Sequence, residues 1–446
     1  MKKITINENI IPPEIVKIIP EGVFCVGGCV RDTILGRTVN DVDLCTPLLP
    51  AKIVERSEDA GFKTISTGIY YGTVIVITSK ASLEITTFRN ESNHDGRYAE
   101  VEFVDNLTKD LSRRDFTINA IAADSNGYIY DPFNGREDIQ QKTIRCVGIP
   151  TDRFKEDLLR IIRAARFAAQ LDFTIEKNTM DAMKEVAPTL IDEIFERISI
   201  ERIVKETEKA FKTTKPSRYL QILWDLNIIQ TIIPEMKNMD ALQQNPKYHP
   251  EGSVWQHTLE AVDRADQSVR WHVLLHDIGK CFTADPVEGK SYNTFYKHEI
   301  IGAKFIDDIG KRLKLSNDLT KSIEVVTRLH MRPFAICRSI KTKPSNKSVR
   351  RLLYEAGLYK DALEKTIRAD SGSRYSPNWD IFWNSEISIN DIIPILMGRH
   401  LIERGHQPGK EIGKILNFAY NYQIDSGETS IKKLYEKAIL EYNNES

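Results

Sequence analysis

The sequence predicts an α+β protein in which a small mixed sheet near the N-terminus is followed by an all-α remainder. Short runs rich in apolar and β-branched residues occur at 23–26, 73–78 and 83–88, and turn residues separate them. Beyond residue 151 the pattern changes, and apolar residues recur at helical spacing through 154–171 without Gly or Pro. A chain of 446 residues is long enough for about three domains.

Domain boundaries are predicted where the pattern changes. Residues 1–150 form a head that contains the sheet, and residues 151–235 form a helical neck. The stretch Pro234–Pro250, with three prolines and two asparagines, separates the neck from a second helical domain over 245–375. A helical extension over 376–446 follows.

The overall charge excludes one class of function. The chain has 62 basic and 63 acidic residues, so it is not a nucleic-acid binder that relies on overall positive charge. A local basic face is compatible with these numbers, since residues 311–351 hold twelve Lys or Arg and only two acids. This stretch is either a solvated helix face or a surface that contacts phosphates.

Nothing in the sequence predicts a membrane or export segment. No apolar run approaches the roughly 18 residues of a membrane span, and the first twenty residues are too polar for a signal peptide. The six cysteines form no CxxC pair, which is typical of reduced thiols. We therefore expect a soluble, cytoplasmic enzyme without a membrane partner.

Two aspartates, Asp41 and Asp43, form the first candidate site. In a strand, residues two apart face the same side, so both carboxylates would project together and repel each other. A divalent cation between them would offset this repulsion, and oxygen ligands favour Mg²⁺. Two such metals can activate a hydroxyl and stabilise a leaving pyrophosphate. The alternative is a surface strand with two solvated acids.

Neighbouring residues could bind a polyphosphate and complete this site. Gly28 follows a predicted strand and opens a helix, where backbone N–H groups approach phosphates, and Arg31 lies in its first turn. Arg114, within a pair of arginines, offers planar donors for phosphate oxygens. Glu84, in the β-rich run 83–88, is the candidate third carboxylate, unless it faces solvent on an edge strand.

These motifs together resemble one enzyme family. They are GGCVRDTILGRTVNDVDLCT at 27–46, LEITTFR at 83–89, LSRRDFTINAIA at 111–122, and further stretches at 154–167 and 196–202. The resemblance is to class II tRNA nucleotidyltransferases and bacterial poly(A) polymerases, which have the polymerase-β-type nucleotidyltransferase fold. It implies an enzyme that extends the 3′ end of tRNA from CTP and ATP.

The resemblance also implies roles for individual residues. Asp41 and Asp43 match the metal-binding carboxylates, and Gly28, Arg31 and Arg114 match contacts to the nucleotide. The residues that match the base-reading helix are Asp157, Arg160, Arg163 and Arg166. On one continuous helix, Asp157 and Arg160 are neighbours, whereas Arg166 points away from Asp157 because each residue turns by about 100°.

The pairing of aspartate with arginine explains base selection chemically. The carboxylate accepts a hydrogen bond from the exocyclic amine of C or A, and the arginine donates to the adjacent ring nitrogen. U and G present a carbonyl in place of that amine, so the aspartate would meet a lone pair.

One loop departs from the family pattern. Residues 90–100, with Asp95, Arg97 and Tyr98, correspond to the loop that family members use to switch from C to A, but the usual proline-bearing ending is missing. This leaves three alternatives open: addition of the whole CCA end, addition of part of it (CC only or A only), or synthesis of a run of A.

A second candidate site consists of histidines and aspartates. The order His257, His276-Asp277 and Asp370 resembles the HD phosphohydrolase superfamily over about 245–375. Imidazole and carboxylate ligands suit Mn, Ni, Fe or Zn, and His298 and His330 would complete a second metal position. Water on such a metal can attack a phosphoester, although some members of this fold keep the ligands without useful turnover. His249 and His272 are expected to be ordinary core or surface residues.

Two classes of function follow from these sites. The first is template-independent CCA addition to tRNA with Mg²⁺, with a possible phosphohydrolase side activity at a transition-metal site. The second is an HD phosphohydrolase whose head only binds nucleotides.

Overall fold

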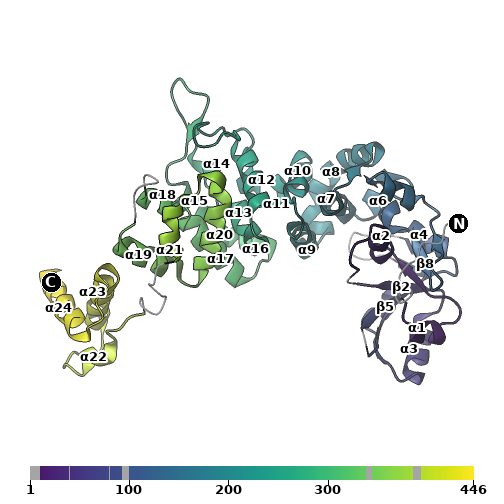
Figure 1. Ribbon diagram of the computed structural model, residues 1–446, viewed down its shortest axis with the longest axis horizontal. Helices are drawn as coiled ribbons and strands as arrows, with labels where there is room; N and C mark the ends of the chain where they lie inside the picture. The colour runs from purple at the N-terminus through teal and green to yellow at the C-terminus, as the bar shows by residue number, and fades with distance from the viewer. Residues whose placement is uncertain are drawn as a thin grey trace. The chain divides into compact units, whose positions relative to one another are not determined.

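The computed structural model describes residues 11–39, 41–79, 81–92, 100–337, 344–384 and 393–445. The chain forms two compact units, Met1–Ile232 and Ile233–Ser446 (Figure 1). Head and neck therefore share the first unit. Among the described residues, no helix combines the length and the apolar character that crossing a membrane requires.

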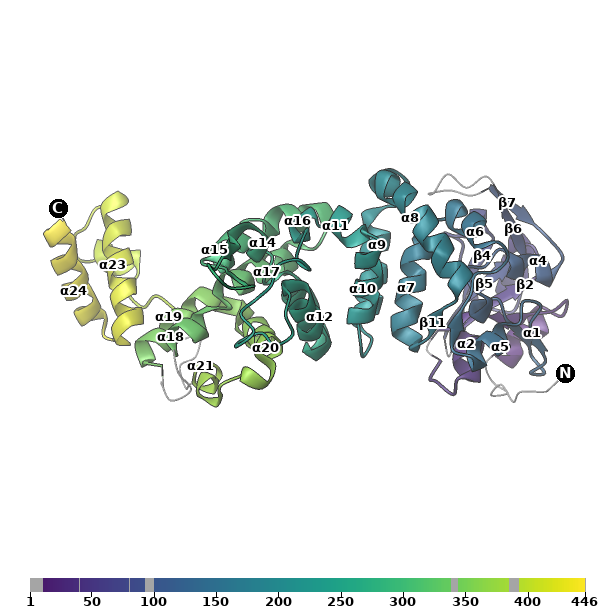
Figure 2. The ribbon, with the colours of Figure 1, turned by 90° about the horizontal axis from the view of Figure 1, so that it is seen from above.

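The head is built on a seven-stranded sheet of order β3-β4-β5-β2-β1-β8-β9, and Figure 2 shows β4, β5 and β2 side by side. The strands are β1 (Phe24–Val26), β2 (Asp43–Thr46), β3 (Lys63–Ile65), β4 (Thr73–Ile77), β5 (Ser82–Thr87), β8 (Ala122–Asp124) and β9 (Ile129–Tyr130). Only β2 and β5 pair in parallel, while the other neighbours are antiparallel. This mixed sheet confirms the predicted α+β class.

Short helices and two smaller strand pairs complete the head. The helices are α1 (Pro13–Ile18), α2 (Gly28–Ile34), α3 (Pro50–Asp59), α4 (Leu107–Ser112) and α5 (Gly135–Gln140). The strands β6 (Arg89–Ser92) and β7 (Glu100–Phe103) form an antiparallel pair that flanks the loop singled out above. The strand β10 (Thr143–Ile144) pairs in parallel with β11 (Thr174–Ile175) of the neck, so the neck is not purely helical.

The neck consists of six helices within the described residues. They are α6 (Pro150–Glu156), α7 (Leu159–Leu171), α8 (Lys177–Arg197), α9 (Ile200–Phe211), α10 (Ser217–Asp225) and α11 (Ile228–Ile232). The buried face of α7 packs against α9 and α10. Alanines at 164, 165, 168 and 169 leave room for this close approach.

The single helix predicted over 154–171 is wrong at one residue. Asp157 has an extended backbone, with φ −143° and ψ 102°, and separates α6 from α7. Its Oδ1 accepts the N–H of Leu159 at 3.1 Å. The side chain of an aspartate can accept a hydrogen bond from a nearby backbone N–H, and this bond competes with the hydrogen bonds of a continuous helix. The spacing of apolar residues carries no information about such a bond.

The second unit is helical apart from a short hairpin of β12 (Asp285–Pro286) and β13 (Asn293–Thr294). Its helices are α12 (Val254–Arg264), α13 (Arg270–Leu275), α14 (Lys280–Thr283), α15 (His298–Ala303), α16 (Ile306–Leu313), α17 (Asn317–Leu329), α18 (Arg332–Ile336), α19 (Asn346–Ala356), α20 (Lys360–Ser371), α21 (Asp380–Trp383), α22 (Gly398–Ile402), α23 (Lys410–Ser426) and α24 (Ile431–Glu445). The helices α23 and α24 lie side by side (Figures 1 and 2).

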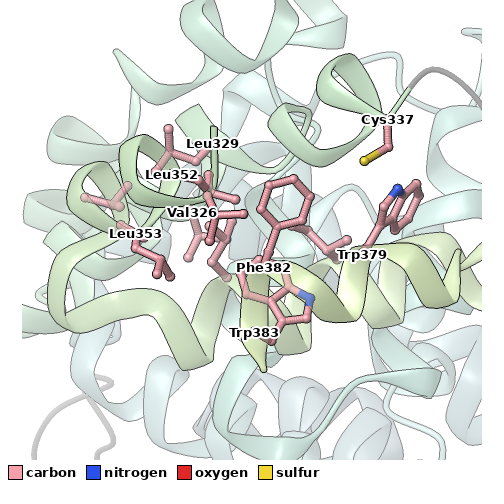
Figure 3. Packing of buried hydrophobic residues seen from close by; sticks show 13 residues of the cluster. Val326, Leu329, Cys337, Leu352, Leu353, Trp379, Phe382 and Trp383 are labelled. Carbon is pink, nitrogen blue, oxygen red and sulfur yellow. The ribbon is translucent and has the colours of Figure 1, made fainter. Parts of the chain in front are cut away.

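An aromatic cluster forms the core around α17 and α19. Figure 3 shows Phe382 and Trp383 pointing toward Val326, Leu352 and Leu353. Burying large aromatic side chains removes much apolar area from water, which makes this cluster a major source of stability for the helices that surround the second candidate site.

The basic stretch 311–351 is not a free cationic surface. Its nine described basic residues all have partners within the protein. For example, Arg312 contacts Glu235 at 2.6 Å, and Lys347 contacts Asp425 at 2.9 Å. The other three, Arg338, Lys341 and Lys343, lie outside the described residues. Four of the acids, Glu235, Asp307, Glu355 and Asp425, come from outside the stretch, so part of the excess counted along the sequence is neutralised in space.

Candidate active site and metal centre

A cavity of about 1150 Å³ lies between the head sheet and the neck helices of the first unit. Eight of the predicted site residues line it: Gly28, Arg31, Asp43, Arg114, Asp157, Arg160, Arg163 and Arg166. Asp41 and Glu84 are not among the lining residues. Further cations on its wall, Arg37, Arg113, Lys209, Lys212, Lys215 and Arg218, were not singled out from the sequence. The lining is strongly cationic, which suits a polyanionic ligand.

Strand register brings two of the three candidate carboxylates together. Asp43 is the first residue of β2 and is the pairing partner of Glu84 in the parallel strand β5, so both side chains lie on the same face. Asp41 precedes the strand, which contradicts the expectation that both aspartates lie within it. The ladder with β5 begins at Asp43, so the backbone of Asp41 has no strand partner there.

The protonation equilibria of this group reflect its crowded negative charge. Desolvation and the nearby Asp41 raise the pKa of Asp43, although the Arg114 guanidinium opposes them. Desolvation and Asp43 likewise raise the pKa of Glu84, against the opposing charge of Arg89. Carboxylates that repel each other at the edge of a cationic cavity form a set of oxygen ligands that fits a hard divalent cation.

A tight turn connects β1 to α2 beside these carboxylates. Gly27 has φ +81°, a left-handed conformation that favours glycine, and a Cβ there would lie 3.0 Å from Nη1 of Arg114. Gly28 then begins α2, and the buried Arg31 is fixed by two bonds of 2.9 Å to Asp32. The turn thus lets backbone and arginine approach the same part of the cavity.

A chain of charge-assisted hydrogen bonds joins head and neck. Arg31 donates to Oδ1 of Asn119 at 2.6 Å, and Asn119 donates to Asp115 at 3.0 Å. Asp115 accepts two bonds from Arg163 of α7, at 2.8 and 2.6 Å. Burial would raise the pKa of Asp115, but Arg163 and Asn119 lower it to about 2. The carboxylate is therefore ionised and pairs the head with α7.

A second carboxylate and an aromatic ring hold the arginines of α7. Glu206 of α9 is buried and accepts a bond from Nε of Arg166, while its other oxygen lies 3.7 Å from Arg163. The guanidinium carbons of Arg163 and Arg166 lie 5.4 and 3.8 Å from the ring centre of Phe167, and that of Arg31 lies 5.2 Å away. Cations over an aromatic face are attracted by its negative charge density.

The base-reading candidates are not paired with each other. Oδ2 of Asp157 accepts a bond from Arg202 at 2.9 Å, whereas Arg160 donates to Glu156 at 2.6 Å. Because the helix breaks at Asp157, the prediction that Arg166 points away from it is wrong, and both line one cavity. Four further residues of the site, Arg202, Glu206, Asn119 and Phe167, were not predicted from the sequence. Asn119, Phe167 and Arg202 lie within the motif stretches 111–122, 154–167 and 196–202, whereas Glu206 lies outside all of them.

The loop that departs from the family pattern begins in β6 and ends in β7. Asp95, Arg97 and Tyr98 lie outside the described residues.

The second candidate site is a buried cluster in the second unit. Nε2 of His257 lies 2.9 Å from Oδ1 of Asp370, and Nε2 of His276 lies 3.2 Å from Oδ2 of Asp277. The other oxygen of Asp277 lies 3.2 Å from Nε2 of His298. His330 completes the group, with its Nε2 3.1 Å from that of His298. All six predicted residues therefore converge.

The charges of this cluster fit a metal. Burial alone would lower the pKa of His276, but Asp277 and Asp370 outweigh it and raise the pKa to about 10. The pKa of each aspartate is held well below its usual range by the neighbouring histidines, against the effect of burial. Two ionised, buried carboxylates among imidazoles attract a cation, and this mixture of N and O ligands suits a transition metal.

Four further residues lie beside the cluster. Nζ of Lys280 lies 2.7 Å from Asp277 and 2.7 Å from Gln244, and Glu251 lies 2.5 Å from Nδ1 of His257. His249, expected to be ordinary, lies 3.1 Å from Glu251 beside the cluster. His272 has the expected structural role, since it bonds to Ser322 at 2.7 Å.

Comparison with known families matches three parts of the chain. "Poly A polymerase head domain" matches residues 23–145, "Probable RNA and SrmB-binding site of polymerase A" matches 172–240, and "HD domain" matches 253–369.

Individual relatives extend the match. A CCA-adding enzyme from Pediococcus pentosaceus is 32% identical over 397 residues, which covers 88% of this chain and 87% of that protein. A CCA-adding enzyme from Streptococcus suis is 47% identical over 188 residues. This match covers 42% of this chain and 44% of that relative, which is less than half of the length of either protein.

Solved structures share the fold. The Bacillus stearothermophilus CCA-adding enzyme in complex with CTP has a TM-score of 0.69 and 26% identity, and the match covers 97% of this chain and 98% of that one. The Thermotoga maritima CCA-adding enzyme complexed with tRNA has a TM-score of 0.58 at 20% identity, over 96% and 93% of the chains.

The mixed-sheet head, the helical neck and the HD domain place the chain in the class of proteins that combine a poly(A) polymerase-type head with an HD domain. Within that class, the chain belongs to the CCA-adding enzyme family, as its motifs predict.

The Asp115–Arg163 pair leads to a prediction about stability. Replacing Asp115→Asn removes the nearer of two carboxylates from the partly buried guanidinium of Arg163 and leaves only Glu206, 3.7 Å away, which costs about 1–3 kcal/mol at neutral pH. Because the pKa of Asp115 is about 2 in the folded chain, below its unfolded value near 3.9, this contribution is present above pH 4 and is lost toward pH 2. Urea unfolding of both proteins should show a difference that shrinks as the pH falls through this range.

The matched control is Asp59→Asn at the exposed end of α3. It should change stability by less than about 0.5 kcal/mol at every pH. A D115N protein as stable as the parent at pH 7 would contradict the assigned role of the pair.

Proposed function

We propose that this chain adds C and A nucleotides to the 3′ end of tRNA, using CTP and ATP and releasing pyrophosphate. The observation that carries the proposal is the register of Asp43 with Glu84 at the edge of a cationic cavity that reaches the neck. Relatives described as CCA-adding enzymes, including structures in complex with CTP, ATP and tRNA, support it.

The carboxylates are assigned to the catalytic metals. Asp41 and Asp43 would hold Mg²⁺, and Glu84, on the same face, would assist them. Bound there, Mg²⁺ supplies Lewis-acid activation of the RNA 3′-hydroxyl and of the α-phosphate. Gly28 offers a backbone N–H, and Arg31 and Arg114 offer guanidinium donors to the triphosphate.

The neck is assigned to base selection. Each oxygen of Asp157 accepts one hydrogen bond, from Arg202 or from the N–H of Leu159. A carboxylate can accept about four hydrogen bonds in total, so Asp157 can still accept one from the exocyclic amine of a base. Glu156 holds Arg160, and Asp115 and Glu206 hold Arg163 and Arg166. The N–H groups of these arginines that remain unbonded can contact the base of the incoming nucleotide, so the protein itself could select the base and no nucleic-acid template would be needed.

The same chemistry admits narrower products. A poly(A) polymerase would use ATP alone, and a partial enzyme would add only CC or only the final A.

Since the substrates are nucleoside triphosphates and tRNA, and the six cysteines are all free thiols, we assign the activity to the cytoplasm.

A gel assay tests the proposal directly. Transcripts of tRNA that end before CCA, after C and after CC are incubated with Mg²⁺ and with CTP, ATP or both. We expect addition that stops at CCA. Addition of C alone, or of A only to the CC transcript, would indicate a partial enzyme, and a long A tail would indicate a poly(A) polymerase. No extension would exclude nucleotidyl transfer.

In the same assay, Asp43→Asn should lower the rate by about a thousandfold or more, because a metal ligand that stabilises transition-state charge by several kcal/mol is lost. Asp41→Asn should behave similarly, while the surface variant Asp59→Asn should match the parent. Full extension by the D41N/D43N double variant would show that the site is assigned wrongly.

Base selection gives a second prediction. Asp157→Ala should reduce the preference for CTP over UTP by about tenfold to a hundredfold, since a specific polar contact to a base discriminates by about 1–3 kcal/mol. Asp172→Asn is the matched control, because Asp172 lines the same cavity but pairs with Arg218. Single-turnover incorporation of each nucleotide measures both variants. An unchanged ratio in D157A would remove Asp157 from base reading.

The buried cluster favours a second activity, metal-dependent phosphoester hydrolysis in the second unit. His257, His276, Asp277 and Asp370 would hold one transition metal such as Mn, Ni, Fe or Zn, and His298 and His330 would contribute to a second position. Such a metal supplies an activated water, and Lys280 places a positive charge beside Asp277, where it can face a phosphate.

The two activities should separate by mutation. The double variant His276→Ala with Asp277→Ala is expected to lose bound transition metal and any hydrolysis of bis(p-nitrophenyl) phosphate, while CCA addition is retained. His400→Gln, outside the cluster, is the control. Metal analysis and both activity assays on the same preparations check this. Loss of CCA addition together with metal would contradict independent sites.

A further inference from the structure

The four histidines of the buried cluster direct the same ring nitrogen toward it. Nδ1 of His276, His298 and His330 lies 2.7, 2.8 and 2.7 Å from the carbonyl oxygen of the residue three positions earlier. A ring that donates from Nδ1 keeps the lone pair of Nε2 free for a metal. The backbone therefore sets the tautomer of these three rings.

Their positions in the helices explain why the backbone can do this. His276 and His330 directly follow the last residues of α13 and α17, and His298 is the first residue of α15. Carbonyl groups in the last turn of a helix have no intrahelical partner, so those of Val273 and Thr327 accept side-chain donors. The carbonyl of Phe295, before α15, has two lone pairs and also accepts the backbone N–H of His298 at 3.4 Å.

His257 lies in a different environment. It is the fourth residue of α12, and the carbonyl three positions earlier, that of Val254, accepts a bond from the hydroxyl of Thr258 at 2.9 Å. Its Nδ1 is instead 2.5 Å from Oε1 of Glu251, which belongs to the segment before the helix. Nδ1 of His298 has a carboxylate 3.7 Å away, that of Glu299, but among the described members of the cluster only His257 has a carboxylate oxygen within hydrogen-bonding distance of Nδ1.

We infer that Glu251 is a positioning residue of the metal site: it fixes the tautomer and the ring orientation of His257. The inference rests on the metal centre proposed above. By accepting the N–H of Nδ1, the carboxylate directs the lone pair of Nε2 toward Asp370, 2.9 Å away, and toward Asp277, 3.7 Å away. A negative acceptor also makes the imidazole a stronger ligand than a neutral carbonyl does.

The geometry argues against a separate metal between Glu251 and its neighbours. Two ligands that each lie about 2.0–2.2 Å from one ion are usually about 3 Å or more apart, whereas Oε1 and Nδ1 of His257 are separated by 2.5 Å. This is a hydrogen-bonding distance. His249 donates to the same oxygen from 3.1 Å, and its ring packs edge-on against that of His257 at 4.8 Å, so it holds the carboxylate in place.

Cobalt binding to the full-length protein tests the inference. The metal-free protein is titrated with Co²⁺ in excess Mg²⁺, which occupies the carboxylates of the head, and the visible absorption of Co²⁺ reports its ligands. Glu251→Gln is nearly isosteric but lacks the charge, and we expect its dissociation constant for Co²⁺ to rise tenfold to a hundredfold. The number of ions bound at saturation should be unchanged, and the Co²⁺ spectrum should shift.

Controls separate a positioning role from general damage to the fold. Glu260→Gln replaces an exposed carboxylate on the same helix, which bonds to Gln256, and should leave Co²⁺ affinity unchanged. Glu251→Ala should weaken binding at least as much as E251Q does. CCA addition is expected to match the parent, because Glu251 is not part of the nucleotide cavity. Thermal unfolding of the metal-free variants measures separately any stability lost with the hydrogen bonds of Glu251 to His249 and His257.

Three results would overturn the inference. Equal affinity and an equal spectrum in E251Q would show that the carboxylate does not tune His257. Loss of one bound ion per chain would show that Glu251 is itself a ligand. A parent protein that binds no Co²⁺ would remove the proposed metal centre as well, and this outcome differs from the first two because it appears before any variant is made.

Discussion

Buried carboxylates hold the arginines of the nucleotide cavity in place, and this balance of charge organises the first unit. Arg163 and Arg166 share the face of Phe167, where two like charges would repel each other without acids beside them. Asp115 comes from the head and Glu206 from α9, so the counter-charges arrive from both sides of α7. Because these partners are themselves buried, the arginine positions are fixed before any nucleotide binds. The cavity is thereby preorganised for a polyanion.

The two candidate metal sites use different ligand chemistry. The head offers exposed carboxylates on one sheet face, a set of hard oxygen donors that suits an ion arriving with a nucleotide. The second unit offers four imidazoles with two aspartates in a fully buried cluster, which suits a softer ion that stays bound. The separation of ligand types within one chain allows two kinds of phosphate chemistry without competition for one metal.

Local sequence patterns predict most of the fold and most of the site. Alternation and apolar runs indicate the strands of the head, and the spacing of Asp41, Asp43 and the histidines indicates both clusters. Strand register is not local information, so the pairing of Asp43 with Glu84 emerges only from the sheet. The helix break at Asp157 is also invisible to periodicity, because a single residue hardly alters an average over 18 positions.

Partners that are distant in the chain are the hardest to predict. Glu206 lies forty residues from Arg166, and nothing in its helical stretch distinguishes it from a solvated acid. The basic stretch 311–351 shows the converse error, since its counter-ions, such as Glu235 and Asp425, lie outside the window that was counted. Sequence patterns identify ligands that belong to one motif. The residues that orient those ligands are close to them only in the folded protein, so the sequence does not reveal them.

The contact between α19 and the end of α23 has a consequence for how the chain can vary in evolution. Arg350 donates to the carbonyls of Ile424 and Asp425, at 2.6 and 3.0 Å, and so caps α23 from another helix. Gly427 follows with φ +73°, and a Cβ there would lie 2.8 Å from Nη1 of Arg350. A side chain at 427 would therefore be strained and would also displace the cap. Positions 350 and 427, far apart in the sequence, constrain each other and should change together among homologues.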